Sequence, residues 1–364
     1  MADVTQSQVE AAIKEYIDPF SEKDLVATKA IKNIEVNGSA VKVSVTLGYP
    51  AKSFVETLTN ELKSRIEGID GVDSADISVD WKIAAHAVQK TLKPIEGVKN
   101  IIAIASGKGG VGKSTTAVNL ALALSAEGAT VGILDADIYG PSQPRMLGVE
   151  GGKPESDDGQ TLEPMNSYHI QSMSIGFLID AETPMIWRGP MVTQALEQLL
   201  KDTKWRDVDY LIVDLPPGTG DIQLTLAQKV PVSGAVIVTT PQDIALLDAR
   251  KGLKMFQKVE VPVLGIVENM SIHICSECGH EEHIFGQGGG MAMSDDYDVD
   301  FLGALPLDMS IRVSTDDGKP SVVADPDSRI SEIYRDIARR TAAKLALHGK
   351  SYASKFPNIV IQNN

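Results

Sequence analysis

A glycine-rich segment carries the clearest chemical signal in this chain. It follows the apolar run 101–105, fits the pattern G-x-x-x-x-G-K-[ST], and reads Gly107-Lys108-Gly109-Gly110-Val111-Gly112-Lys113-Ser114-Thr115. Glycines let successive backbone N–H groups turn toward phosphate oxygens, and the positive end of the following helix faces the same anion. Lys113 is placed to reach β- and γ-phosphates, and the Ser114 hydroxyl can take one position on Mg²⁺. The segment therefore predicts a phosphate-binding loop for a nucleotide and its magnesium ion.

Aspartates follow two other apolar runs. Asp135 and Asp137 come directly after 131–134, and their spacing lets both carboxylates face one cleft. Asp214 ends the run 210–214, which places a carboxylate beside Mg²⁺. Gly218 and Gly220 follow it and permit a backbone change when a γ-phosphate leaves. These carboxylates complete the predicted nucleotide site.

A cysteine pair lies beyond the strand predicted at 263–268. Cys275 and Cys278 have the C-x-x-C spacing, which lets both sulfurs point at one metal centre. One chain supplies only two thiolates, so three arrangements stay open. A symmetric dimer can pool two pairs, His280 and His283 can complete a zinc site, or the pair can act as a redox dithiol.

Composition limits the class of protein. A length of 364 residues is enough for two domains, and a formal charge of −15 argues against a general nucleic-acid or anionic-membrane surface. We see no secretory signal and no apolar run of membrane-spanning length. With only two cysteines, three residues apart, the sequence predicts a soluble, cytoplasmic protein without a disulfide scaffold.

The elements that must position these residues are alternating strands and helices. Apolar strands are predicted at 101–105, 130–135, 210–214, 235–240, 263–268 and 301–305, and an amphipathic helix at 116–127. Near-continuous apolar strands with intervening helices predict an α/β fold, in which helices cover both faces of a mostly parallel sheet. Ligands in such sheets bind at the carboxyl ends of the strands, where every polar motif above is found.

A small α+β domain is predicted before this sheet, at residues 1–85. Helical spacing at 4–17 and 54–66, a hairpin of 31–36 and 40–47 around Asn37-Gly38, and a strand at 72–81 define it. We expect a linker at 86–99, a nucleotide-binding domain at 100–348 and a C-terminal tail at 349–364.

The nucleotide motifs resemble the deviant Walker A class of P-loop NTPases, which includes MinD and the nitrogenase iron protein. That resemblance implies that Lys108 reaches across a homodimer interface to the partner's nucleotide and that Asp137 orients the attacking water. It further implies that Asp135 supports Mg²⁺ through water or fixes its loop, and that Asn269 reads the adenine of ATP.

The combination is closer still to one family. GKGGVGKST, DADIYGPS, DLPPGTGD and ENM followed by C-x-x-C resemble the Mrp/ApbC ATPases, and residues 1–85 resemble the MIP18-like domain. The resemblance implies a homodimer that binds and slowly hydrolyses ATP, holds a [4Fe–4S] cluster on Cys275 and Cys278 of each subunit, and passes it to apo-proteins. A MinD/ParA-like positioning ATPase and an ATPase with a structural zinc site are the alternatives.

Overall fold

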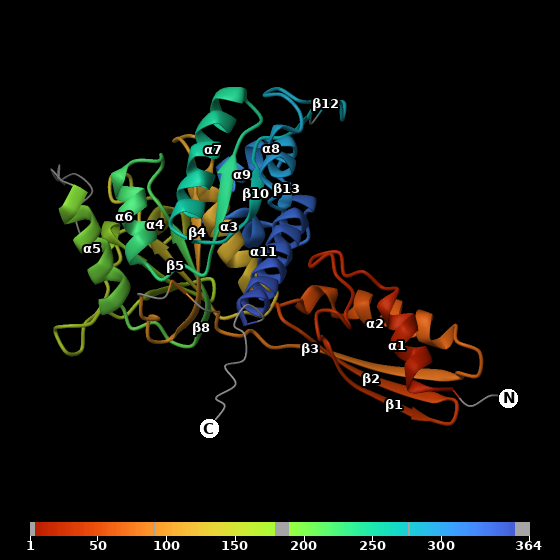
Figure 1. The fold of residues 1–364 in the computed structure, drawn as a ribbon. Helices are drawn as coiled ribbons and strands as arrows, with labels where there is room; N and C mark the ends of the chain where they lie inside the picture. Colours follow the sequence, from red (N-terminus) through yellow and green to blue (C-terminus); the bar gives the residue numbers. More distant parts are fainter. Residues whose placement is uncertain (1–3, 87, 90–91, 179–188, 276, 354–364) are drawn as a thin grey trace, which may run out of the picture. The chain divides into compact units, whose positions relative to one another are not determined.

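The computed structural model describes residues 4–86, 88–89, 92–178, 189–275 and 277–353. The chain forms two compact units, one of residues 1–84 with 342–364 and the other of residues 85–341. Figure 1 shows their helices and strands. The larger unit contains every predicted chemical motif, so it is described in more detail.

The N-terminal unit is built on a small sheet. Its elements are α1 (Gln6–Lys14), β1 (Ile31–Asn37), β2 (Ala40–Leu47), α2 (Val55–Glu67) and β3 (Ser74–Trp81). Strand β2 pairs antiparallel with β1 through the tight turn at Asn37-Gly38 and parallel with β3, so α2 is the crossover between β2 and β3. Buried Leu58, Leu62 and Ile66 give α2 its apolar face. The predicted α+β organisation is confirmed.

A mostly parallel sheet forms the centre of the larger unit. Within the described residues its strand order is β13-β10-β9-β4-β8-β5-β7-β6, and only β6 runs antiparallel to its neighbour. The bounds are β4 (Val98–Ala105), β5 (Val131–Asp135), β6 (Met165–Ser167), β7 (Ile170–Ser174), β8 (Val208–Asp214), β9 (Gly234–Thr239), β10 (Val263–Glu268) and β13 (Phe301–Ala304). The strands β4, β5, β8, β9 and β10 are buried almost throughout, as strands covered on both faces must be.

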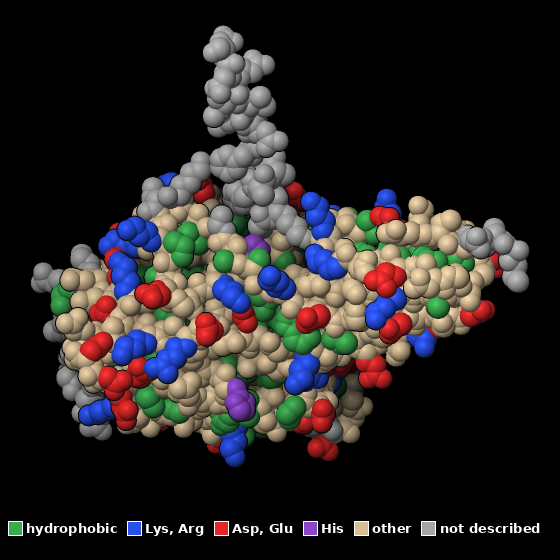
Figure 2. Space-filling model, turned by 90° about the horizontal axis from the view of Figure 1, so that it is seen from below, with side chains coloured by type: hydrophobic (Ala, Val, Ile, Leu, Met, Phe, Trp, Pro, Cys, Tyr) green, Lys and Arg blue, Asp and Glu red, His purple; other side chains and the backbone are tan. Residues whose placement is uncertain are grey.

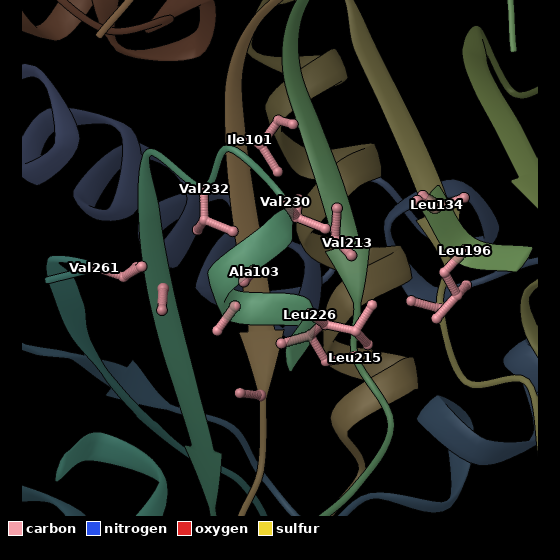
Figure 3. Packing of buried hydrophobic residues seen from close by; sticks show 14 of the residues in the cluster. Ile101, Ala103, Leu134, Leu196, Val213, Leu215, Leu226, Val230, Val232 and Val261 are labelled. Carbon is pink, nitrogen blue, oxygen red and sulfur yellow. The ribbon is translucent and has the colours of Figure 1, made fainter. Parts of the chain in front are cut away.

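Helices cover both faces of this sheet (Figure 1). They are α3 (Lys113–Ala126), α4 (Gln143–Met146), α5 (Gly189–Asp202), α6 (Asp221–Lys229), α7 (Asp243–Lys258), α8 (Gly289–Tyr297), α9 (Met309–Asp316), α10 (Ser321–Ala324) and α11 (Arg329–Ala353). Side chains of α5, α6 and α7 form one apolar core with the strands, and Figure 3 shows Leu226 and Val230 beside Val213 and Ala103. The predicted α/β fold with a parallel sheet is confirmed.

Three local expectations differ from the structure. The helix after the phosphate-binding loop is not amphipathic: α3 is buried at every position from Thr116 to Leu124, because the sheet lies on one side and α10 packs on another. The strands β6 and β7 were not predicted, because 165–174 carries Asn, Gln and Ser on a short edge hairpin. At the other end, α11 continues to Ala353, into the predicted tail, and residues 354–364 lie outside the described residues.

Candidate nucleotide site and cysteine pair

The phosphate-binding loop connects β4 to α3. Gly110 and Gly112 have φ angles of 82° and 79°, a left-handed conformation that glycine adopts without strain. In the part of the chain that the structure describes, the amides from Gly109 to Gly112 donate to no protein acceptor. Gly107 has another role, because a Cβ there would lie 2.1 Å from the backbone carbon of Asp248 in α7. The loop thus offers a row of free N–H groups at the start of a helix, which suits an anion.

Lys113 forms an ion pair with a carboxylate of the neighbouring strand end. Its ammonium contacts Asp214 Oδ1, lies 3.1 Å from Ser114 Oγ and is 4.0 Å from Asp137 Oδ2. The side chains of Lys113 and Asp214 are 6% and 0% exposed, so each charge is compensated by the other. The geometry places three other predicted site residues around the Lys113 ammonium.

Gln143, at the start of α4, is a member of this cluster that the sequence analysis missed. Its side-chain Nε2 donates to Asp214 Oδ2 at 2.9 Å and to the carbonyl of Ser114 at 3.1 Å. Gln143 is 1% exposed, and its Oε1 has no partner among the described residues. The only sequence signal was its place after the Gly-Pro-Ser turn that follows Asp137.

Asp135 organises the loop that carries Asp137. One of its oxygens, Oδ2, accepts from the amides of Ser142 and Gln143 at 2.9 and 3.0 Å and from Ser174 Oγ at 3.1 Å. The other, Oδ1, accepts from the amide of Asp137 at 3.2 Å. Complete burial, and then the charge of Asp214, raise the pKa of Asp135 to about 7. Of the two roles expected for Asp135, these contacts favour fixing the loop.

Asp137 is less enclosed, with a side chain 14% exposed. Burial raises its pKa above the ordinary range although the Lys113 ammonium opposes that shift. An aspartate with access to the cleft and a raised proton affinity is suited to holding a water molecule.

Two loops flank the site. In the segment after β8, the amide of Gly218 donates to the carbonyl of Ser106 at 3.0 Å, which connects that segment to the phosphate-binding loop. Lys108 is half-buried, its carbonyl accepts from Ser106 Oγ at 2.9 Å, and its ammonium pairs with no carboxylate of the described chain. The Lys108 ammonium is therefore available to an anion that the described chain does not itself supply.

These groups fit a nucleotide with Mg²⁺. The free amides and Lys113 match phosphate oxygens, while the Ser114 hydroxyl and Asp214 carboxylate are oxygen donors of the kind Mg²⁺ takes. Thr115 is the third residue of α3, and its carbonyl accepts a hydrogen bond from Asn119 Nδ2.

Asn269 follows β10 and contacts the phosphate-binding loop. Its Nδ2 donates to the carbonyl of Val111 at 2.9 Å, and its Oδ1 accepts from the amide of Met270 at 2.9 Å. A Cβ on Gly112 would lie 2.1 Å from that Nδ2, so the glycine is needed for this approach. Adenine recognition by Asn269 stays a prediction.

The cysteine pair stands on a short hairpin after Asn269. The strands β11 (His273–Ile274) and β12 (Glu281–Glu282) pair antiparallel, and the turn between them carries a half-buried Cys275 and an exposed Cys278. Hydrogen bonds from the Cys278 and Glu277 amides lower the pKa of Cys275, which favours the thiolate. Within the described residues, no third His, Cys, Asp or Glu joins these thiols to form a metal site. The imidazole of His283 instead donates through Nδ1 to the carbonyl of Ser271 at 3.0 Å.

Comparison with known proteins agrees with both halves of the chain. Residues 97–342 match the family described as "NUBPL iron-transfer P-loop NTPase", and residues 6–79 match "Iron-sulfur cluster assembly protein". An iron–sulfur cluster carrier protein of Salmonella typhimurium is 49% identical over 348 residues, covering 96% of this chain and 94% of that protein. The iron–sulfur cluster transfer protein NUBPL of Mus musculus is 52% identical over 255 residues, covering 70% of this chain and 80% of its own.

Solved structures support the fold. A nucleotide-binding protein of Archaeoglobus fulgidus in complex with ADP superimposes with a TM-score of 0.57 at 37% identity, covering 65% of this chain and 92% of that chain. The cell division ATPase MinD of Pyrococcus furiosus gives a TM-score of 0.50 at 24% identity, covering 66% and 97%, which shows likeness of fold alone. From its match over residues 97–342, this chain belongs to the NUBPL family of iron-transfer P-loop NTPases.

Proposed function

We propose that this chain is an ATP-dependent carrier in which two copies hold one [4Fe–4S] cluster and pass it to apo-proteins. The observation that carries the proposal is the hairpin after β10, where Cys275 and Cys278 are accessible and no further ligand of the described chain joins them. A cluster of this type takes four thiolates, so two subunits would each supply a pair. Relatives with 49% identity over 96% of this chain are named iron–sulfur cluster carriers.

The environment of Lys108 is a second argument for a dimer. A half-buried ammonium without a carboxylate of its own subunit is suited to the phosphates bound by the partner subunit. In this arrangement each nucleotide lies between two chains, and ATP closes the dimer around both sites. Closure or hydrolysis then changes the geometry of the shared thiolates and favours release of the cluster.

Within one subunit, different residues of the nucleotide site bind the phosphates, bind Mg²⁺ and orient the attacking water. The amides of residues 107–115 hold the phosphates, and Lys113 turns from Asp214 toward them. Ser114 and Asp214 hold Mg²⁺, which neutralises charge on the phosphates when it is bound. Asp137 orients the attacking water, and Asp135 keeps the Asp137 loop in place.

We further propose apo iron–sulfur proteins and cluster-assembly scaffolds as partners, and the cytoplasm as the location. Two free thiols suit a reducing compartment. Acidic and basic side chains are interspersed on the face in Figure 2, and no basic stripe for nucleic acid is visible there. The whole sequence has a formal net charge of −15. In the described part of the chain, no helix combines the length and apolarity needed to span a bilayer.

Metal analysis tests the cargo. After anaerobic purification we expect iron and acid-labile sulfide near four each per dimer, with loss of both in Cys275→Ala/Cys278→Ala. Stoichiometric zinc in a colourless protein, persisting after anaerobic reconstitution, would replace the carrier by an ATPase with a structural zinc site.

Nucleotide use is tested separately with Lys113→Ala. We expect ATP affinity to fall at least about tenfold, because the buried ammonium that the proposal places on the phosphates of its own subunit is removed. Cluster content should stay near that of wild type, since the cysteine hairpin is untouched, while complementation of a carrier-deficient strain should be lost. Normal complementation would show that cluster delivery does not need this nucleotide site.

A further inference from the structure

A continuous set of hydrogen bonds connects the phosphate-binding loop to the cysteine hairpin. It begins at Asn269, whose Nδ2 donates to the Val111 carbonyl and whose own amide donates to the carbonyl of Thr239 in β9 at 2.7 Å. Asn269 is 8% exposed and held from both sides. A shift of the loop at Val111 would therefore change or break the contact at Nδ2.

The next residues are fixed just as closely. Met270 has a φ of 55°, an uncommon left-handed conformation for a long side chain, and its amide donates to Asn269 Oδ1. Ser271 Oγ donates to Glu268 Oε1 at 2.6 Å, and Glu268, 1% exposed, accepts the Gly290 amide at the start of α8. Residues 269–271 are thus fixed by hydrogen bonds and include one residue in a strained backbone conformation.

This segment is also bound to both ends of the hairpin. His283, just after β12, donates from Nδ1 to the Ser271 carbonyl at 3.0 Å. Before β11, Ile272 accepts from the Leu307 amide at 2.8 Å. The turn itself is closed by the Cys275 amide donating to the His280 carbonyl at 2.9 Å. The hairpin whose turn carries the thiols is therefore attached at both ends to the segment that Asn269 begins: β11 continues from it along the chain, and His283 after β12 contacts Ser271.

We propose that Asn269 is the positioning residue that couples nucleotide binding to the cysteine pair within one subunit, acting through residues 269–271 and His283. Nucleotide phosphates bind the amides of the loop whose Val111 carbonyl Asn269 holds, so occupancy changes the position of Asn269. The Ser271–His283 contact transmits that change to the hairpin. This inference rests on the proposed carrier function. It adds a connection between the nucleotide site and the cysteine hairpin that lies within one subunit and does not involve the dimer interface.

The test uses the full-length apo-protein, whose only two cysteines are Cys275 and Cys278. The rate of alkylation by iodoacetamide is measured without nucleotide and with saturating Mg²⁺ and a non-hydrolysable ATP analogue. For wild type we expect the two rates to differ at least about threefold. In Asn269→Asp, which keeps the acceptor for Met270 but loses the donor to Val111, the ratio should fall close to one.

A second variant lies away from the nucleotide. His283→Ala removes the contact to Ser271, so we expect at least half of the nucleotide effect on alkylation to be lost with ATP affinity unchanged. Matched controls are Asn166→Asp, the same change at an exposed asparagine of β6, and Glu281→Gln on the exposed face of the same hairpin. Both should keep the wild-type ratio.

The outcomes separate the two proposals. A wild-type ratio that survives in both Asn269→Asp and His283→Ala overturns the coupling role, even if metal analysis confirms the carrier. A selective fall in ATP over GTP affinity in Asn269→Asp, with the alkylation ratio intact, would assign Asn269 to base recognition instead. Equal alkylation rates of the wild-type protein with and without nucleotide would also overturn the coupling. A purified protein without iron or acid-labile sulfide would instead overturn the carrier function itself.

Discussion

Lys113 and Asp214 form a buried ion pair, and its burial limits how either residue can change its partner when a nucleotide binds. Removing one partner of a buried ion pair leaves an uncompensated charge, which costs about 3–5 kcal/mol. In the proposed function, nucleotide binding would exchange these partners, so that phosphates take Lys113 and Mg²⁺ takes the Asp214 carboxylate. The Gln143 amide already holds the other oxygen of Asp214, which keeps that carboxylate in position during the exchange.

Gln143→Leu tests that role at the level of one side chain. The substitution keeps the volume but removes the buried donor from Asp214 Oδ2 and the side-chain hydrogen bond to the Ser114 carbonyl, so we expect the free energy of unfolding to fall by about 1–3 kcal/mol. Urea unfolding measures it, with Gln257→Leu on the exposed face of α7 as the matched control, for which a change within about 0.5 kcal/mol is expected. A Gln143→Leu protein as stable as the control would remove Gln143 from the framework of the site.

Asp135 predicts a pH dependence of the nucleotide-free protein. Its folded pKa of about 7 lies above the unfolded value, so the folded chain keeps a proton that the unfolded chain has lost. The contribution of this group to stability is present at low pH and is lost as the pH rises from about 4 to about 7, at up to about 1.4 kcal/mol per pH unit. Urea unfolding of wild type and Asp135→Asn at several pH values measures the slope. Equal slopes in the two proteins would contradict the assignment.

The sequence named residues that the structure brings together, but it did not predict the contacts between them. Lys113, Ser114 and the aspartates could be named because a phosphate and its magnesium ion demand particular groups at fixed spacing. Gln143 could not, since a glutamine in a loop has no such signature and its partners, Ser114 and Asp214, come from distant parts of the chain. The contact between Asn269 and Val111 was missed for the same reason.

At the scale of elements, the phosphate-binding loop depends on two glycines for different reasons. Both Gly110 and Gly112 have left-handed backbones, but a Cβ on Gly110 would meet nothing within 4 Å, whereas one on Gly112 would overlap Asn269. We expect Gly110→Ala to cost about 1–2 kcal/mol from its φ angle alone and Gly112→Ala to cost clearly more. Urea unfolding of the two variants without nucleotide measures the difference. Equal destabilisation would mean that Asn269 does not pack against the loop as described.

The sequence predicted the bounds of the strands most accurately where the strands are buried in the centre of the sheet. Buried parallel strands such as β5 and β10 were predicted within a residue of their bounds, because they are apolar runs that end in a single acidic residue. The pattern was insufficient for α3, which is enclosed on most sides by other elements, and for β6 and β7, a short hairpin rich in polar residues of which β6 forms the edge of the sheet. Both cases depend on contacts with elements distant in the sequence, which a local hydrophobic pattern does not contain.

At the scale of the whole molecule, the account requires a second copy of the chain. One subunit offers two thiols on an accessible hairpin and a lysine without an internal carboxylate partner in its described part. A shared cluster explains the first feature, and a nucleotide shared across the interface explains the second. The proposed dimer would place both chemistries between the same two subunits.

The number of chains that hold one cluster is the most direct measurement of this account. Native mass spectrometry of the anaerobically purified protein should show two chains with a single [4Fe–4S] cluster. The Cys275→Ala/Cys278→Ala protein should show chains without one. A cluster or a zinc ion bound stoichiometrically to a single chain would contradict the shared site, and with it the proposal that closure of the dimer controls release.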